Sequence, residues 1–378
     1  MLNPILGLWI IFFSSLVQAK IPQQISDCLK RLHGTVQEEA PLYAQGFSAY
    51  RAKEFSFIEI KKGFGLKGEA EIILISPTPL LCPGIKMLRP PFKRVLSLST
   101  TFIPLFELGK NQDFLLAISG KNFINSAWAM ERLKDGRVKD LGYPPNLETL
   151  AYLAPDLILL YPLAEQEFSL EAKLKALKLN YLSFAEYLEP HPLGRAEWIK
   201  VFCNILECGV NVNDFFSKIV GDYENIKSRA QKTATRPKVM MGSFWGGDWQ
   251  SPGGDSYLAK LVYDAGGDYV FASPKTSQTK VMDFEFVYSI FPSVTIWLPH
   301  ASMRDLNSLQ QEDSRYNMLK KFNLQIFNYD KIKSENGGID FWENGVYRPD
   351  LVLSDLMQIF HPELGTGQSL VWYRALKW

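Results

Sequence analysis

An amphipathic pattern runs without interruption from residue 213 to residue 232, in the middle of the chain. Apolar side chains recur there at steps of three and four, which places them on one stripe of an α-helix. Asn213 can cap the start of this helix, and basic residues crowd its end, as the helix dipole favours. At ~1.5 Å per residue the helix spans about 30 Å, roughly the width of a small domain. The residues on the apolar stripe are Phe215, Phe216, Ile219, Val220, Tyr223 and Ile226.

Two similar segments flank this helix, at 146–161 and 283–298. Each begins with a short helical pattern that contains a glutamate, Glu148 or Glu285, and continues through a proline into an apolar run. Because proline disfavours helix in the residue before it, each copy is predicted to be a short helix followed by a buried strand. Together with the helix between them, the copies predict two similar α/β lobes joined by a rigid helix, with a cleft between the lobes.

Strand and helix patterns also alternate through both lobes, which favours mostly parallel sheets with helices on both faces. The predicted fold class is therefore α/β, with two Rossmann-like lobes joined by one long rigid helix and a small N-terminal β extension. The expected boundaries are a signal peptide at 1–19, an extension with a β-hairpin at 20–90, an N-terminal lobe at 91–210, the interlobe helix at 211–235 and a C-terminal lobe at 236–378.

Charge excludes one class of function. Lys and Arg together number 41 and Asp and Glu 40, and no basic stripe of the kind that nucleic-acid binders carry is present, which excludes nucleic-acid binding.

The start of the chain indicates that the protein is exported. An uncharged apolar run ends at Val17-Gln18-Ala19, which matches the small residues of a cleavage site, and the run is too short to span a bilayer. We expect a cleaved signal peptide, with an uncleaved membrane anchor as the alternative; no cysteine stands at the cleavage point, which disfavours a lipid anchor.

The four cysteines leave two interpretations open. Cys28 and Cys82 could close a bridge across the extension. Cys203 and Cys208 lie on a helical pattern, where five residues of separation exceed disulfide reach unless the helix breaks at Gly209. Buried free thiols are the favoured interpretation. No C-x-x-C motif is present, so neither a redox motif nor a zinc knuckle is indicated.

Candidate chemistry follows the strands, because ligands of parallel sheets bind off the carboxyl ends of the strands. The residues there are rich in aromatics and poor in nucleophile–base sets. Trp245 and Trp249 stand on a predicted glycine-rich loop, where exposed indoles suit a large planar ligand and buried ones would simply cover the core. Trp342 could likewise contact the ligand or simply cover the core. His300 ends a predicted strand on the cleft side and is a further candidate for contact with the ligand. The motifs of zinc proteases, α/β-hydrolases and P-loop enzymes are missing from the sequence.

Several motifs in order give the chain a family resemblance, namely RVLSLSTT, ISGKNFIN, VKDLGYPPNLETLAYLAPDLILLY, GGDSYLAKLVYDAGGDYVF and WENGVYRPDLVLSDLMQIFHPEL. It resembles class III periplasmic substrate-binding proteins of ABC importers, which carry ferric siderophores, haem or cobalamin. The resemblance covers about Ala44 to Trp378.

The resemblance implies a monomeric periplasmic protein that is not an enzyme and holds no cofactor of its own. Its partners would be a ferric siderophore or a corrinoid, which brings its own metal, and a permease dimer in the inner membrane. Glu148 and Glu285, one on each lobe, would dock to that permease; helix-start carboxylates without a partner are the alternative. The expected ligand-binding residues are Trp245, Trp249, Trp342, Tyr143, Phe123, Thr100 and His300.

Two other classes of function remain. One is an enzyme on the same frame that acts on a periplasmic chelate through Asp248, Asp255 or His300. The other is a sensory or interaction domain that has lost transport.

Overall fold

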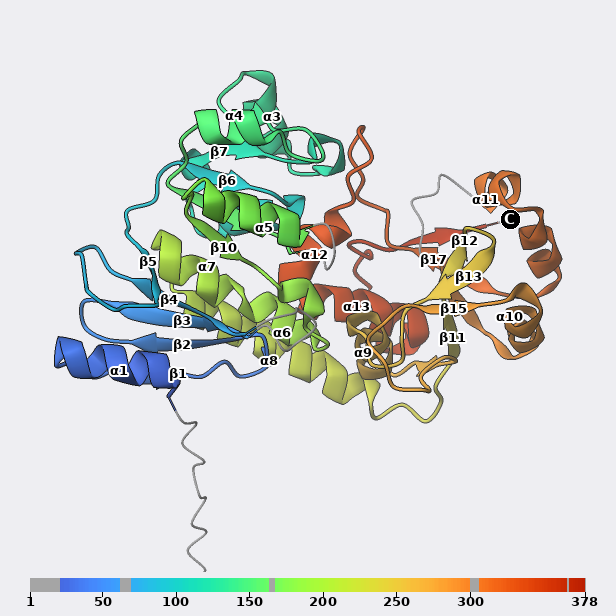
Figure 1. Ribbon diagram of the computed structural model, residues 1–378. Coiled ribbons are helices and arrows are strands. Elements are labelled where there is room, and N and C mark those ends of the chain that lie inside the picture. The colour runs from blue at the N-terminus through green and yellow to red at the C-terminus, as the bar shows by residue number, and fades with distance from the viewer. Residues whose placement is uncertain (1–20, 62–68, 163–166, 300–305, 366, 378) are drawn as a thin grey trace, which may run out of the picture.

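The computed structural model describes residues 21–61, 69–162, 167–299, 306–365 and 367–377, which form two α/β lobes with a further sheet on the N-terminal one (Figure 1). The predicted signal peptide and His300 lie outside the described residues. The predicted fold class is confirmed: each lobe has its own largely parallel sheet, and one long helix runs beneath both.

The sheet of the N-terminal lobe is parallel throughout, in the order β10-β9-β6-β7-β8. Its strands are β6 (Val95–Ser97), β7 (Leu115–Ile118), β8 (Lys139–Asp140), β9 (Leu157–Leu160) and β10 (Tyr181–Ser183). Its helices are α2 (Ile103–Leu108), α3 (Ala127–Lys134), α4 (Leu147–Tyr152) and α5 (Glu167–Ala176). The order reverses between β6 and β9, so the ligand crevice of such a sheet is expected off their carboxyl ends.

The sheet of the C-terminal lobe has the order β14-β11-β16-β17-β18, with only β18 antiparallel to its neighbour. The strands are β11 (Lys238–Met241), β14 (Asp268–Tyr269), β16 (Ile296–Leu298), β17 (Gln325–Asn328) and β18 (Arg374–Leu376). The helices are α9 (Tyr257–Asp264), α10 (Phe284–Ile290), α11 (Leu306–Glu312), α12 (Asn344–Tyr347) and α13 (Pro349–Phe360). The two repeated segments occupy matching places, since α4 leads to β9 and α10 leads to β16, and each strand has parallel neighbours on both sides.

The long helix is α8 (Val212–Ala230), and its cap is Asn211 rather than the expected Asn213. The Asn211 side chain accepts hydrogen bonds from the backbone N–H of Asn213 and Asp214. The apolar stripe faces inward as predicted, with Phe216, Ile219 and Tyr223 buried, and each such side chain contributes about 1.5–3 kcal/mol by leaving water. The stripe packs against the C-terminal lobe, and the short helices α6 (Pro192–Glu197) and α7 (Ile199–Leu206) precede it.

The N-terminal extension is larger than the predicted hairpin. Its five strands pair in sequence order, and helix α1 (Gln23–Leu32) covers one face. The other face belongs to the core of the N-terminal lobe, because Phe47 and Ile58 pack in the same cluster as Trp198 of the following helices. The strands are β1 (Gln37–Glu39), β2 (Phe47–Arg51), β3 (Ser56–Ile60), β4 (Glu71–Ile75) and β5 (Lys86–Leu88).

Two buried glutamates attach the extension to the helices beneath the lobes. The Glu197 carboxylate accepts hydrogen bonds of 2.8–3.0 Å from the backbone N–H groups of residues 42–44. Glu189 accepts those of residues 45 and 46, together with the indole N–H of Trp198 at 2.9 Å. Charge-assisted hydrogen bonds of this kind are worth roughly 1.5–3 kcal/mol each. They fix the extension beside the start of α8.

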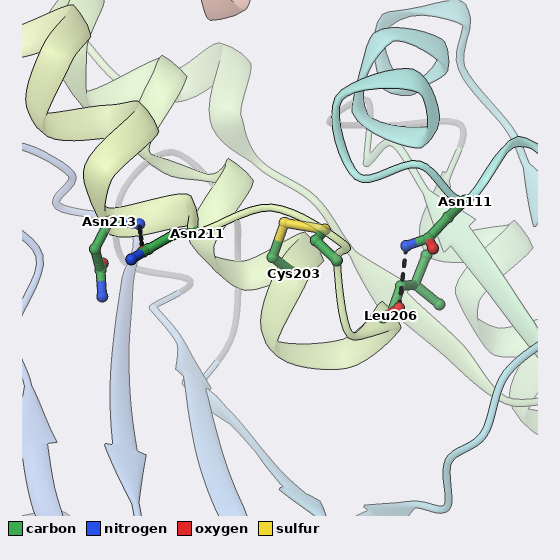
Figure 2. Close-up of a disulfide and its surroundings, with 6 residues drawn as sticks. Asn111, Cys203, Leu206, Asn211 and Asn213 are labelled. Atoms are coloured by element: carbon green, nitrogen blue, oxygen red, sulfur yellow. Dashed lines mark hydrogen bonds between the residues drawn. A yellow bond between two sulfur atoms is a disulfide. The ribbon is translucent and has the colours of Figure 1, made fainter.

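All four cysteines are in disulfides, so the favoured interpretation of free thiols is wrong. Cys28 joins Cys82, which ties α1 to the sheet of the extension. Cys203 joins Cys208 with their Cα atoms 4.8 Å apart, because α7 ends at Leu206 and Glu207 adopts a left-handed conformation. Figure 2 shows this disulfide between Asn111, whose side chain donates to the Leu206 carbonyl at 3.0 Å, and the cap of α8.

The segment from residue 243 to 251 is a β-hairpin, not the predicted glycine-rich loop. Strand β11 ends at Met241. After Gly242 the chain continues into β12 (Ser243–Trp245) and β13 (Asp248–Ser251), and β13 also pairs with β15 (Lys280–Met282). Gly246 and Gly247 form the two-residue turn with φ values of 62° and 97°. Positive φ at both positions is what a tight hairpin turn requires, and glycine adopts it without strain.

A second connection joins the lobes through residues 331–343, here named the interlobe loop. In Figure 1 this orange-red segment rises from the C-terminal lobe toward the N-terminal one. The Glu343 carboxylate accepts hydrogen bonds from the backbone N–H of Asn125 at 2.8 Å and of Ser126 at 3.1 Å. Gly338 lies so close to the backbone that an added Cβ would stand 2.3 Å from the carbonyl oxygen of Phe123. The interlobe loop thus contacts the N-terminal lobe in addition to the connection through α8.

The two disulfides should differ in their effect on stability. Replacing both cysteines of a pair by alanine removes a loop closure of 54 residues for Cys28–Cys82 and of 5 residues for Cys203–Cys208. Chain entropy then predicts losses of about 4 and about 2 kcal/mol in the free energy of unfolding. Urea denaturation of the two double variants measures which of them loses more free energy of unfolding. The opposite order would mean that the short bridge acts mainly through the packing of α7 and α8.

The contact of Glu343 should make stability depend on pH. Burial raises the pKa of Glu343 to about 8, although the two backbone N–H groups lower it. The folded protein therefore keeps a proton that the unfolded chain releases, and stability falls as pH rises from about 4.5 to about 8. In Glu343→Gln the melting temperature should fall less over this range than in the wild type. If the melting temperatures of the two proteins changed equally with pH, the raised pKa assigned to Glu343 would be contradicted.

Candidate functional site

One pocket opens at the carboxyl edge of the N-terminal sheet and encloses about 220 Å³. Residues that follow three different strands line it, with Thr100 after β6, Gly120 after β7 and Tyr161 after β9. Phe123 and Tyr143 complete one wall, their rings edge to face at 5.8 Å. We name this the aromatic pocket. It lies where the strand order reverses, and it brings together three of the predicted ligand-binding residues: Thr100, Phe123 and Tyr143.

A second pocket, the interlobe pocket, encloses about 270 Å³. Its lining comes from the segment 187–195, from residues 250–258, and from Ser277, Thr279 and Trp342. The two pockets are linked by a stack of two tyrosine rings, since Tyr161 of the aromatic pocket lies 4.6 Å from Tyr187 of the interlobe pocket. Trp342 is half-buried and packs edge to face on Tyr329 and Phe341. Aromatic side chains therefore line a path between the lobes.

The structure contradicts the prediction that Trp249 contacts the ligand, because its indole is fully buried in the C-terminal lobe. Its N–H donates to the carbonyl of Met241 at 3.2 Å, and its ring packs against Phe244, Phe291 and Trp297. The cause is the period of two along β13, which turns Trp249 and Ser251 inward and Asp248 outward. Trp249 is part of the core.

Trp245 stands next to the turn of the same hairpin, with 76% of its surface exposed. Within the described residues it lines neither the aromatic nor the interlobe pocket. Arg315 holds the turn by donating to the Gly247 carbonyl at 2.6 Å, and its guanidinium lies 4.0 Å from the centre of the Phe244 ring. Hydrogen bonds with Asp313 raise the pKa of Arg315, and the nearby charge of Glu285 adds to that rise. Trp245 therefore lies on the side of the lobe that carries Glu285.

A buried acidic group, Glu186, directly precedes Tyr187 of the interlobe pocket. Glu186 has no exposed surface, and one of its oxygens accepts a hydrogen bond from the Thr101 hydroxyl at 3.3 Å. Burial raises the pKa of Glu186 to about 7, against the charge of Arg195, which lowers it. Burial also raises the pKa of Tyr347, whose hydroxyl has no hydrogen-bond partner among the described residues. We did not expect Glu186, Arg195 or Tyr187 from the sequence, whereas Tyr161 carries a visible signal because it directly follows a strand.

The paired glutamates occupy equivalent positions. Glu148 lies in the first turn of α4 and Glu285 in the first turn of α10, and both are exposed. The cap residues, Asn146 and Asp283, each accept a backbone N–H three residues on. In Figure 1 α4 lies at the top of the N-terminal lobe and α10 at the outer edge of the C-terminal lobe. The carboxylates thus point into solvent from matching helix starts.

The residues of the enzyme alternative are not gathered in one place. Asp248 is exposed on the hairpin, and Asp255 lies in a different groove, before α9. In the ranges that the structure describes, no group of three His, Cys, Asp or Glu side chains is arranged to hold a metal ion. Nor does any described helix combine the length and the apolar character needed to cross a bilayer.

Comparison with known proteins agrees with this architecture. A family model described as periplasmic binding protein matches residues 97–321, more than half of the chain. An uncharacterized lipoprotein of Methanocaldococcus jannaschii is 27% identical over 298 residues, which cover 75% of this chain and 69% of that protein.

Solved structures share the fold at low identity. The TroA-like periplasmic binding protein FepB of Veillonella parvula superposes with a TM-score of 0.55 and 15% identity, over 77% of this chain and 96% of that one. CeuE of Helicobacter pylori gives a TM-score of 0.54 and 16% identity, over 81% and 89% of the two chains. With two lobes, a long connecting helix and a family match over most of both lobes, the chain belongs to the periplasmic binding protein family.

Proposed function

We propose that this protein is the solute-binding component of an ABC importer and that it captures a bulky metal chelate, a ferric siderophore or a corrinoid, between its lobes. The observation that carries the proposal is the aromatic path from Phe123 and Tyr143 through Tyr161 and Tyr187 to Trp342. Aromatic rings offer large, flat contact areas that suit a bulky, partly planar ligand. Among the described residues, no comparable cluster of side chains supports the enzyme or the sensory alternative.

In this proposal the metal belongs to the ligand, and the protein supplies stacking and hydrogen bonds. The similar protein from Helicobacter pylori was solved as a nickel–histidine complex, which is in keeping with a metal-containing ligand. Two connections between the lobes, α8 and the interlobe loop, favour a site that is formed before the ligand arrives. Such a site loses little conformational entropy on binding.

We further propose that Glu148 and Glu285 dock on a permease dimer. Two exposed carboxylates at equivalent helix starts, one on each lobe, match a partner with two equivalent basic surfaces. The protein would act as an exported monomer. Two disulfides are in keeping with an oxidising compartment outside the cytoplasm, and a cleaved signal peptide remains part of this proposal.

The aromatic pocket can be tested by calorimetric titration with ferric siderophores, haem, cobalamin and bare metal ions. One chelate should bind saturably while bare metal ions do not. For that chelate, Phe123→Ala combined with Tyr143→Ala should raise Kd at least about tenfold, because the stacking area is lost. Tyr263→Ala is the matched control, since this tyrosine is an exposed aromatic of α9 outside both pockets. Equal affinity of the double variant and the control would refute the assignment.

Docking is tested separately by reversing both charges, with Glu148→Lys and Glu285→Lys in one protein. Uptake of the bound chelate by cells or vesicles that contain the permease should collapse, because like charges would then face each other. The Kd for the chelate should stay at the wild-type value, since neither residue lines a ligand pocket. Normal uptake by the double variant would count against the docking role.

A further inference from the structure

The interlobe pocket contains a buried guanidinium that has no ion-pair partner among the described residues. Arg195 of α6 lines the pocket and is only 6% exposed. Within the described residues its side chain makes no hydrogen bond and no ion pair, and its Nε atom is buried without an acceptor. Its guanidinium lies over the Tyr257 ring at 4.5 Å from the ring centre. Burying a charge is costly unless an opposite charge or hydrogen bonds compensate it.

The nearby carboxyl groups of Glu189 and Glu186 form no hydrogen bond with Arg195. Glu189 also lines the pocket, but its oxygens accept the backbone N–H groups of residues 45 and 46 and the Trp198 indole. One oxygen of Glu186 accepts a hydrogen bond from the Thr101 hydroxyl, and the other oxygen has no partner among the described residues. Because burial raises the pKa of Glu186 to about 7, much of its negative charge is absent near neutral pH. The terminal nitrogens of Arg195 are therefore left for a group that enters the pocket.

The opposite wall of the pocket favours the same kind of group. Helix α9 begins there, with Ser256, Tyr257 and Leu258 all lining the pocket. The Ser256 side chain accepts the N–H of Ala259, which leaves the first N–H groups of the helix at the pocket. A helix start carries partial positive charge and binds anions. The hydroxyl of Tyr257, beneath Arg195, is a further buried donor without a described partner.

We propose that the interlobe pocket is a subsite for an oxyanion, a carboxylate or a phosphate, held between Arg195 of α6 and the start of α9. The anion would join the N-terminal side of the molecule to the C-terminal lobe and neutralise the buried guanidinium. This inference rests on the proposed function in one respect only, the source of the oxyanion. The oxyanion is either an acidic arm of the captured chelate or a small anion that binds independently. An acidic arm would make the preferred ligand an anionic chelate rather than a neutral one.

The first measurement uses small anions on the whole protein and does not require a known chelate. Citrate and phosphate, compared with chloride at equal ionic strength, should raise the melting temperature of the wild type. Arg195→Met keeps most of the side-chain volume and removes the charge, so the variant should lose this rise while melting about as high as the wild type in chloride. Arg195→Lys should keep part of the rise. An equal rise in Arg195→Met, or none in the wild type, would overturn the subsite.

The second measurement separates the two sources of the anion. If the oxyanion is part of the chelate, Arg195→Met should weaken binding of ferric citrate about tenfold or more, and by clearly more than it weakens binding of the neutral ferrichrome complex. If a separate anion occupies the subsite, the response to phosphate should depend on Arg195 while the affinity for either chelate does not. An Arg195-dependent response to anions without binding of any chelate would keep the subsite and reject the proposed function.

Discussion

One type of interaction recurs where irregular segments of this chain are held in place, namely a buried carboxyl group that accepts backbone N–H groups of the segment. Glu197 and Glu189 hold residues 42–46 of the extension, and Glu343 holds the start of α3 across the lobes. Asp355 of α13 does the same for residues 371–373 before the last strand. Each carboxylate loses its hydration on burial, so its N–H partners must be in place for the fold to be stable.

The regular parts of the fold were predictable because their signals are local and periodic. The stripe of α8 and the two copies of helix and strand depend only on spacing within short windows, and the structure has them where the patterns indicate. The hairpin at 243–251 was missed although its signal is present: Gly246-Gly247 separates two short alternating runs, which is typical of a tight turn. The bridge between Cys203 and Cys208 was missed for another reason, since it depends on where α7 ends, and helix ends are set by single residues.

The candidate site was predictable only in part. Thr100, Phe123 and Tyr143 follow strands, and the rule that places ligands at strand ends was enough to bring them together. Arg195 and Glu186 gave no such signal, because nothing in a short helix pattern tells a buried charge from an exposed one. Trp249 shows the converse: an aromatic residue beside glycines looks exposed in the sequence, whereas the pleat of β13 turns it inward.

The contacts of residues 42–46 have a consequence for how this region can change. Within residues 42–46, Glu197 and Glu189 bind main-chain N–H groups only, so these hydrogen bonds do not depend on which side chains the segment carries, provided that proline does not replace a residue whose N–H is used. The exposed side chain of Leu42, at 70% of its surface, takes no part in the attachment. The outer surface of the extension can therefore diverge among relatives, or be redesigned, independently of the joint that fixes it to the lobes.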